Sequence, residues 1–135
     1  MPDENGLARI LIIDDDWETT VLFKILLEPN QFEVFIANSG QQGIKLASET
    51  DPDVIMVDLL MPEMNGFMVC DEVRKFSKVP ILVLTAISKP GTLSEALEHG
   101  ADDYLIKPVK SSVLTAHLKR LVRRERLNRQ VDRYT

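Results

Sequence analysis

Several short apolar runs in this 135-residue chain end on side chains that can serve phosphoryl or metal chemistry. The residues at these ends are Asp14 and Asp15, Asp58, Thr85 and Lys107. Such runs are typical of buried parallel strands, whose carboxyl ends meet at one edge of a sheet. We therefore expect these side chains to form one polar site. It would hold a carboxylate nucleophile, oxygen ligands for a hard cation and a positive charge for phosphate.

Asp58 is the centre of this predicted site. It ends the apolar run 54–57, and turn residues follow it, namely Pro62 and then Asn65 and Gly66. A single aspartate at a strand end is more often a loop or capping residue than a catalytic one. The other polar strand ends are what favour a functional role for Asp58.

The apolar patterns between these ends predict strands that alternate with helices. The predicted strands are residues 10–13, 32–37, 54–57, 81–84 and 104–106. The predicted helices are residues 18–28, 40–48, a segment after Gly66, 92–99, and a last helix from about 111. Asp16 is expected to cap the first of them. This alternation predicts a three-layer α/β fold around a parallel sheet.

Helical spacing also predicts which side chains face the sheet. These are Val21, Leu22, Ile25 and Leu26 in the first helix, Ile44 and Ala47 in the second, Val69, Val73 and Phe76 in the third, Leu93, Ala96 and Leu97 in the fourth, and Leu114, Leu118, Leu121 and Val122 in the fifth. Cys70, the only cysteine, is expected to be a small core residue, and a single cysteine excludes a disulfide within the chain.

Together these residues resemble the receiver domain of two-component response regulators. The matching segments are Asp14–Asp15, residues 58–66, Thr85–Ala86 and residues 100–108, in the family's order and spacing. The resemblance implies a flavodoxin-like sheet of five parallel strands in the order 2-1-3-4-5. It also implies a bacterial, cytoplasmic signalling protein that is not an enzyme, although it assists its own phosphorylation and slow dephosphorylation.

The resemblance assigns a role to each acid. Asp58 would accept a phosphoryl group from a histidine kinase or a histidine phosphotransfer protein. Asp15, Asp58 and the backbone carbonyl of Leu60 would bind Mg²⁺ or Mn²⁺, and Asp14 would act through a water molecule on the metal. This assignment is physically consistent, because clustered carboxylates repel one another and a divalent cation relieves that repulsion.

The resemblance also assigns the groups that bind phosphate and respond to it. Lys107 and Thr85 would contact the phosphoryl oxygens, together with the backbone N–H of Ala86. Thr85 and Tyr104 would form the switch, with the ring turning inward when the threonine moves. A cis bond between Lys107 and Pro108 is implied as well.

Leu60 and Ile87 would control how long the phosphoryl group stays on Asp58. Both are branched and apolar, so neither can orient an attacking water, and slow dephosphorylation is expected. Leu60 also stands where phosphatases with an aspartate nucleophile place their general acid, which disfavours that rival function. A receiver that only binds partners would have lost an acid, the threonine or the lysine, and all are present.

The charge is unevenly distributed along the chain. Residues 119–133 carry a net charge of +5, whereas the remainder carries −10 out of the total of −5. The acidic body argues against direct binding of nucleic acid by the domain. No apolar run approaches the length of a membrane span, and the first residues lack the pattern of a signal peptide.

The predicted domain boundaries follow from these patterns. Residues 1–7 would be an N-terminal tail, residues 8–124 the receiver domain, and residues 125–135 an extension of the last helix. The extension carries a second apolar stripe of Leu127, Val131 and Tyr134. We expect this stripe to dock against a second copy or an output domain.

Overall fold

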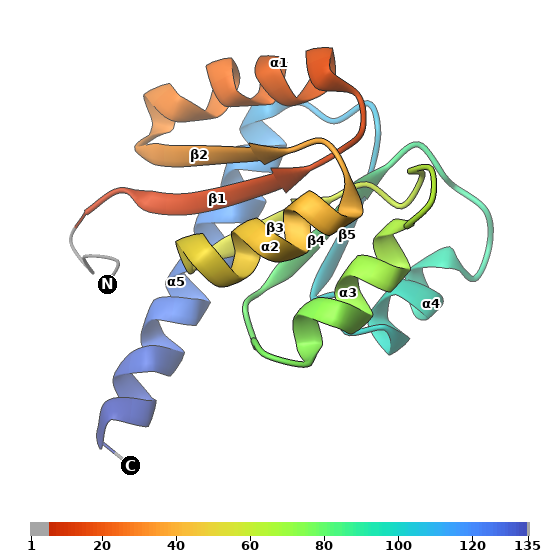
Figure 1. Cartoon of the computed structure of the whole chain (residues 1–135). Coiled ribbons are helices and arrows are strands. Elements are labelled where there is room, and N and C mark those ends of the chain that lie inside the picture. Colours follow the sequence, from red (N-terminus) through yellow and green to blue (C-terminus); the bar gives the residue numbers. More distant parts are fainter. Residues whose placement is uncertain (1–5, 135) are drawn as a thin grey trace.

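The computed structural model describes residues 6–134, with side chains described through residue 132. Its elements are β1 (Ala8–Ile13), α1 (Trp17–Leu27), the 3₁₀ turn η1 (Glu28–Asn30), β2 (Phe32–Ala37), α2 (Gly40–Thr50), β3 (Val54–Val57), α3 (Gly66–Arg74), β4 (Ile81–Thr85), α4 (Thr92–Glu98), β5 (Asp103–Ile106) and α5 (Ser111–Tyr134). The strands are all parallel and lie in the order β2-β1-β3-β4-β5 (Figure 1). The predicted α/β fold and strand order are confirmed.

Two apolar layers cover the sheet. Along β1, Ile10 and Ile12 belong to one layer and Leu11 and Ile13 to the other, because successive side chains of a strand point to opposite faces. Helices α1 and α5 cover the first face, whereas α2, α3 and α4 cover the second (Figure 1). Every residue of β3 is buried, as expected for a central parallel strand covered on both sides.

Side-chain caps start three of the helices near the carboxyl edge of the sheet. Asp16, Ser39 and Asn65 are the N-caps of α1, α2 and α3, and each side chain accepts a backbone N–H from the first turn of its helix. The capping role predicted for Asp16 is therefore confirmed. These caps fix the loops that carry the candidate site.

Helix α1 turns a different face to the sheet from the one predicted. Val21 is only half-buried, and the other members of the predicted stripe are exposed: Leu22, Ile25 and Leu26. Phe23 and the fully buried Leu27 pack inward instead. Between residues 21 and 27 only Lys24 is polar, so the sequence offers more than one apolar stripe. Contacts with the sheet select the inner one.

Two smaller corrections concern α3 and α4. Phe76 is exposed because α3 ends at Arg74, so helical spacing no longer applies to it. Leu93 and Leu97 are also exposed, and α4 buries the small side chain of Ala96. The other predicted inward residues are buried or, for Ile44, partly buried: Ala47, Val69, Cys70, Val73, Leu114, Leu118, Leu121 and Val122.

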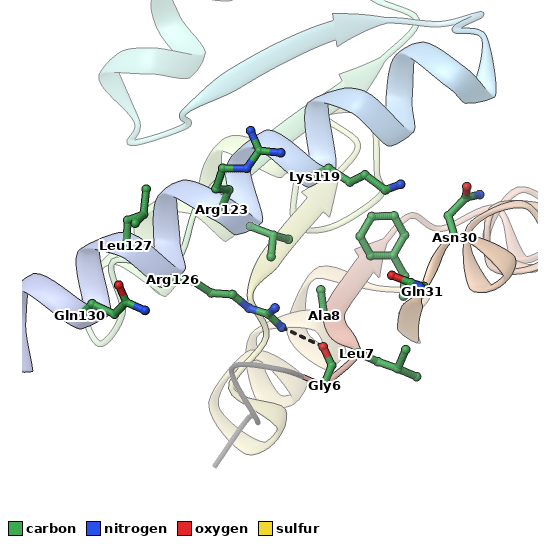
Figure 2. A pocket seen from close by; sticks show the side chains of 12 residues that line it. Gly6, Leu7, Ala8, Asn30, Gln31, Lys119, Arg123, Arg126, Leu127 and Gln130 are labelled. Atoms are coloured by element: carbon green, nitrogen blue, oxygen red, sulfur yellow. Dashed lines mark hydrogen bonds between the residues drawn. The ribbon is translucent and has the colours of Figure 1, made fainter.

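Helix α5 runs without a break past residue 124, and ion pairs hold its last turns to the domain. Arg129 Nη1 lies 3.3 Å from Oδ1 of Asp53, a fully buried residue next to the start of β3. Arg126 donates a hydrogen bond of 3.3 Å to the carbonyl of Gly6 (Figure 2). These contacts fix the direction in which the helix leaves the sheet.

Two apolar side chains of this extension remain exposed, and one of them, Leu127, lines a groove. Leu127 and Val131 are 54% and 59% exposed, while the side chain of Tyr134 lies outside the described ones. A groove of about 690 Å³ separates the extension from the first residues of β1 and β2 (Figure 2). It lies at the amino edge of the sheet, opposite the predicted site. Of the helices in the described part of the chain, α5 included, none is long and apolar enough to cross a membrane.

Candidate functional site

The polar strand ends meet at one edge of the sheet, as predicted. Ile13 of β1 pairs in register with Val57 of β3, so the residues that follow them, Asp14 and Asp58, lie side by side. Both side chains are buried, unlike those of ordinary surface acids: Asp14 is 4% and Asp58 is 9% exposed. Two carboxylates this close and this buried require a positive charge nearby.

Lys107 supplies that charge. Its Nζ lies 3.0 Å from Oδ2 of Asp14 and 3.0 Å from Oδ2 of Asp58. Burial acts to lower the pKa of Lys107, but its hydrogen bonds and ion pairs with the two acids outweigh burial and the pKa is raised. For Asp14, burial raises the pKa, and hydrogen bonds from the Asp16 backbone and from Lys107 only partly offset it. The peptide bond between Lys107 and Pro108 is cis, as predicted.

In the loop after Asp58, the backbone at Gly66 passes very close to the backbone at Asp58. Oδ1 of Asp58 accepts the backbone N–H of Leu60 at 3.1 Å, which holds the carboxylate against the start of the loop. A Cβ atom at Gly66 would lie 2.5 Å from the Asp58 carbonyl oxygen. Only glycine fits there, which explains the Asn65–Gly66 pair at the end of this segment.

The three consecutive acids after β1 have different environments. Asp15 is exposed, and its carboxylate has no hydrogen-bond or ion-pair partner among residues 6–132. Asp16 accepts bonds from the Glu18 N–H at 3.1 Å and from the Thr19 hydroxyl at 2.7 Å. The Thr19 bond is the main reason why the pKa of Asp16 is lowered. Asp15 is thus the carboxylate of the three that is available to a ligand.

Thr85 and Tyr104 both bond to Ile87, in the loop after β4, and neither is hydrogen-bonded to Asp58. Thr85 is fully buried at the end of β4, and its hydroxyl oxygen accepts the Ile87 N–H at 3.4 Å. The Tyr104 hydroxyl donates to the Ile87 carbonyl, and burial raises its pKa. The tyrosine is therefore tied to the loop that follows Thr85. Ala86, which lies between Thr85 and Ile87 in the chain, is exposed.

The donor set fits a hard divalent cation by its chemistry. The carboxylates of Asp14 and Asp58 lie side by side, Asp15 is the next residue in the chain and is exposed, and such oxygen donors suit Mg²⁺. Within the described part of the chain, no three acidic, histidine or cysteine side chains are gathered closely enough to hold an ion as they stand. Lys107 instead occupies the space between Asp14 and Asp58. For Asp15 to share a cation with these two acids, its side chain would have to turn inward.

Sequence reasoning missed one residue at this edge. Asn38 follows the last residue of β2 and donates a hydrogen bond of 2.8 Å to the backbone carbonyl of Asp14. The pair Asn38–Ser39 signals a turn or a helix cap, but no periodicity indicates a contact 24 positions away in the chain. Only the pairing of β1 with β2 brings the two residues together.

The comparisons with known proteins agree with this geometry. A family model described as "Response regulator receiver domain" matches residues 10–119. The chain is 37% identical over 118 residues to the transcriptional regulatory protein AfsQ1 of Streptomyces coelicolor, covering 87% of this chain and 52% of the relative. It is 38% identical over 116 residues to the transcriptional regulatory protein SrrA of Staphylococcus aureus, covering 86% and 48%.

Solved structures agree as well. The crystal structure of a response regulator receiver domain protein from Clostridium thermocellum superposes with a TM-score of 0.84 at 31% identity, covering 90% of this chain and 98% of that one. The chain spans about half the length of the curated relatives that it matches.

Proposed function

Since this chain belongs to the response regulator receiver domain family of two-component systems, we propose that Asp58 is its phospho-acceptor. The supporting observation is the position of Asp58 at the end of β3, beside Asp14 and within 3.0 Å of Lys107. The phosphoryl donor would be a histidine kinase or a histidine phosphotransfer protein. An Asp58 oxygen bonds to phosphorus as the bond from phosphorus to the donor's imidazole nitrogen breaks, and the electron pair leaves with the imidazole.

Charge neutralisation is the main task of the surrounding residues. Asp15, Asp58 and the Leu60 carbonyl would hold Mg²⁺ or Mn²⁺, with Asp14 acting from further out. When bound, the cation neutralises charge on the phosphoryl oxygens. Lys107 binds a phosphoryl oxygen from the opposite side, as a mobile point charge on a flexible stem. To do so it exchanges its bond to Asp58 for one to phosphate.

Thr85 and Tyr104 would convert phosphorylation into a change of surface. Thr85 and the Ala86 N–H donate to phosphoryl oxygens, which draws the end of β4 toward Asp58. Tyr104 follows because its hydroxyl is bonded to the Ile87 carbonyl in the same loop. This bond links the aromatic ring on β5 to the segment that the phosphoryl group would move.

A direct experiment tests the proposed function. The protein is incubated with a small acyl phosphate and MgCl₂, and its intact mass is measured with and without EDTA. We expect a mass increase of one phosphoryl group, carried by the peptide that contains Asp58, only when the metal is present. The absence of any increase with both a small donor and a histidine kinase would contradict the proposal.

Leu60 and Ile87 are expected to slow the loss of this phosphoryl group. Hydrolysis requires a water molecule in line with the bond to Asp58, and neither apolar side chain can hydrogen-bond that water. The double variant Leu60→Asn with Ile87→Glu should shorten the half-life of phospho-Asp58 about tenfold, equivalent to about 1.4 kcal/mol of barrier. The decay is followed by intact mass, with Mg²⁺ affinity as the control. Decay no faster than that of the parent would refute this role.

The extension of α5 is proposed to carry an interface with a second copy or an output domain. Leu127 and Val131 lie one helical turn apart and are exposed, so their replacement by serine removes apolar surface while Arg129 keeps its bond to Asp53. We expect the double serine variant to self-associate more weakly than the parent in sedimentation velocity. Truncation after Arg124 should have the same effect. An unchanged mass distribution in both would exclude self-association through the extension.

A further inference from the structure

Asn38 connects three segments around the acids. From the end of β2, its Nδ2 donates to the Asp14 carbonyl at 2.8 Å and lies 3.2 Å from the Thr20 hydroxyl. Because a carbonyl can only accept, this contact fixes the orientation of the amide. Thr20 is fully buried, and its hydroxyl donates to the Trp17 carbonyl at 2.7 Å. Asn38 is thus anchored at a fixed point on α1.

This contact restrains the backbone at Asp15. The Asp14 carbonyl and the Asp15 N–H belong to one planar peptide unit, so holding the oxygen fixes the orientation of the whole plane. The Asp15 side chain has no partner among residues 6–132, so the position of its backbone limits where its carboxylate can reach. A residue at the end of the edge strand β2 can therefore influence Asp15 without contacting its side chain.

We propose that Asn38 is a positioning residue for divalent-cation binding, acting through the peptide between Asp14 and Asp15. It holds the Asp15 backbone at the point from which the carboxylate can turn toward Asp14 and Asp58. The proposal rests on the proposed function only for the role of the cation in phosphorylation. The affinity for the cation is measured without phosphorylation. Residues that orient metal ligands typically contribute tenfold or more to metal affinity.

The test is isothermal titration of the full chain with MgCl₂. Asn38→Ala should raise the dissociation constant about tenfold. Gln42→Ala is the matched control, because Gln42 Oε1 accepts the Asn38 backbone N–H at 2.9 Å in the same turn but does not contact Asp14. We expect the control to bind Mg²⁺ as the parent does. Thermal unfolding in EDTA should show similar midpoints for both variants, which separates positioning from stability.

Two further measurements make the result specific. Thr20→Val removes the second anchor of Asn38 together with the bond to the Trp17 carbonyl. Its affinity should be intermediate, and adding it to Asn38→Ala should weaken binding no further. In phosphorylation assays Asn38→Ala should need more Mg²⁺ for half-maximal rate yet approach the parent rate at saturation.

Either of two outcomes would overturn the proposal: unchanged affinity in a folded Asn38→Ala protein, or an equal loss in Gln42→Ala. Weakened affinity without any phosphorylation of the parent would support the positioning role and refute the proposed function instead.

Discussion

Replacement of Asp58 by alanine is expected to abolish phosphorylation by both a small acyl phosphate and a histidine kinase. The reason is geometric as well as chemical. Asp14 lies beside Asp58, but burial raises its pKa, and its two oxygens already accept bonds from the Asp16 N–H and from Lys107. It is therefore a poor substitute nucleophile. The measurement is intact mass with peptide mapping after incubation with donor and Mg²⁺.

The neighbouring acids provide graded controls for this experiment. Asp15→Ala should also abolish labelling, because it removes the exposed carboxylate proposed to hold the cation. Asp16→Ala should leave most of the labelling intact, since the Asp16 carboxylate is engaged in capping α1 through Glu18 and Thr19. Labelling retained in Asp58→Ala would show that another residue is the acceptor.

Replacement of Lys107 by alanine is expected to destabilise the protein, and Mg²⁺ is expected to restore part of the lost stability. The lysine joins two carboxylates that are almost entirely buried, and its own side chain is only 25% exposed. Removal of one partner from a buried ion pair costs about 3–5 kcal/mol. We expect roughly 2 kcal/mol for Lys107→Ala, because the site opens to solvent at one side and Asp14 can take up a proton.

Thermal unfolding of Lys107→Ala in EDTA and in MgCl₂ measures this effect. The midpoint should fall by several degrees in EDTA, and Mg²⁺ should raise it more than it raises that of the parent, because a bound cation then replaces the missing charge. Lys110→Ala is the matched control, since Lys110 is exposed in the same loop and has no ion pair among the described residues. Equal Mg²⁺ responses in the variant and the parent would argue against cation binding between these acids.

The sequence alone determined which elements form and which residues gather at their ends. Four apolar residues in a row, as in 54–57, are typical of a strand in a covered parallel sheet, and a polar residue directly after them is then expected at its carboxyl edge. This reasoning is enough to predict that Asp14, Asp58 and Lys107 lie together. It works because strand ends and residue types are local properties of the chain.

Only the tertiary structure decided which of several apolar faces of helix α1 packs against the sheet. Residues 21–27 of α1 are apolar nearly all round, so the choice of Phe23 and Leu27 over Leu22 and Ile25 came from packing against the sheet.

Long-range polar contacts could not be predicted from the sequence either. Asn38 reaches Asp14, and Arg129 reaches Asp53, across 24 and 76 positions of the sequence. A hydrogen bond between distant residues leaves no periodic signal in the sequence, because its partners are brought together by strand pairing and helix packing rather than by their spacing along the chain.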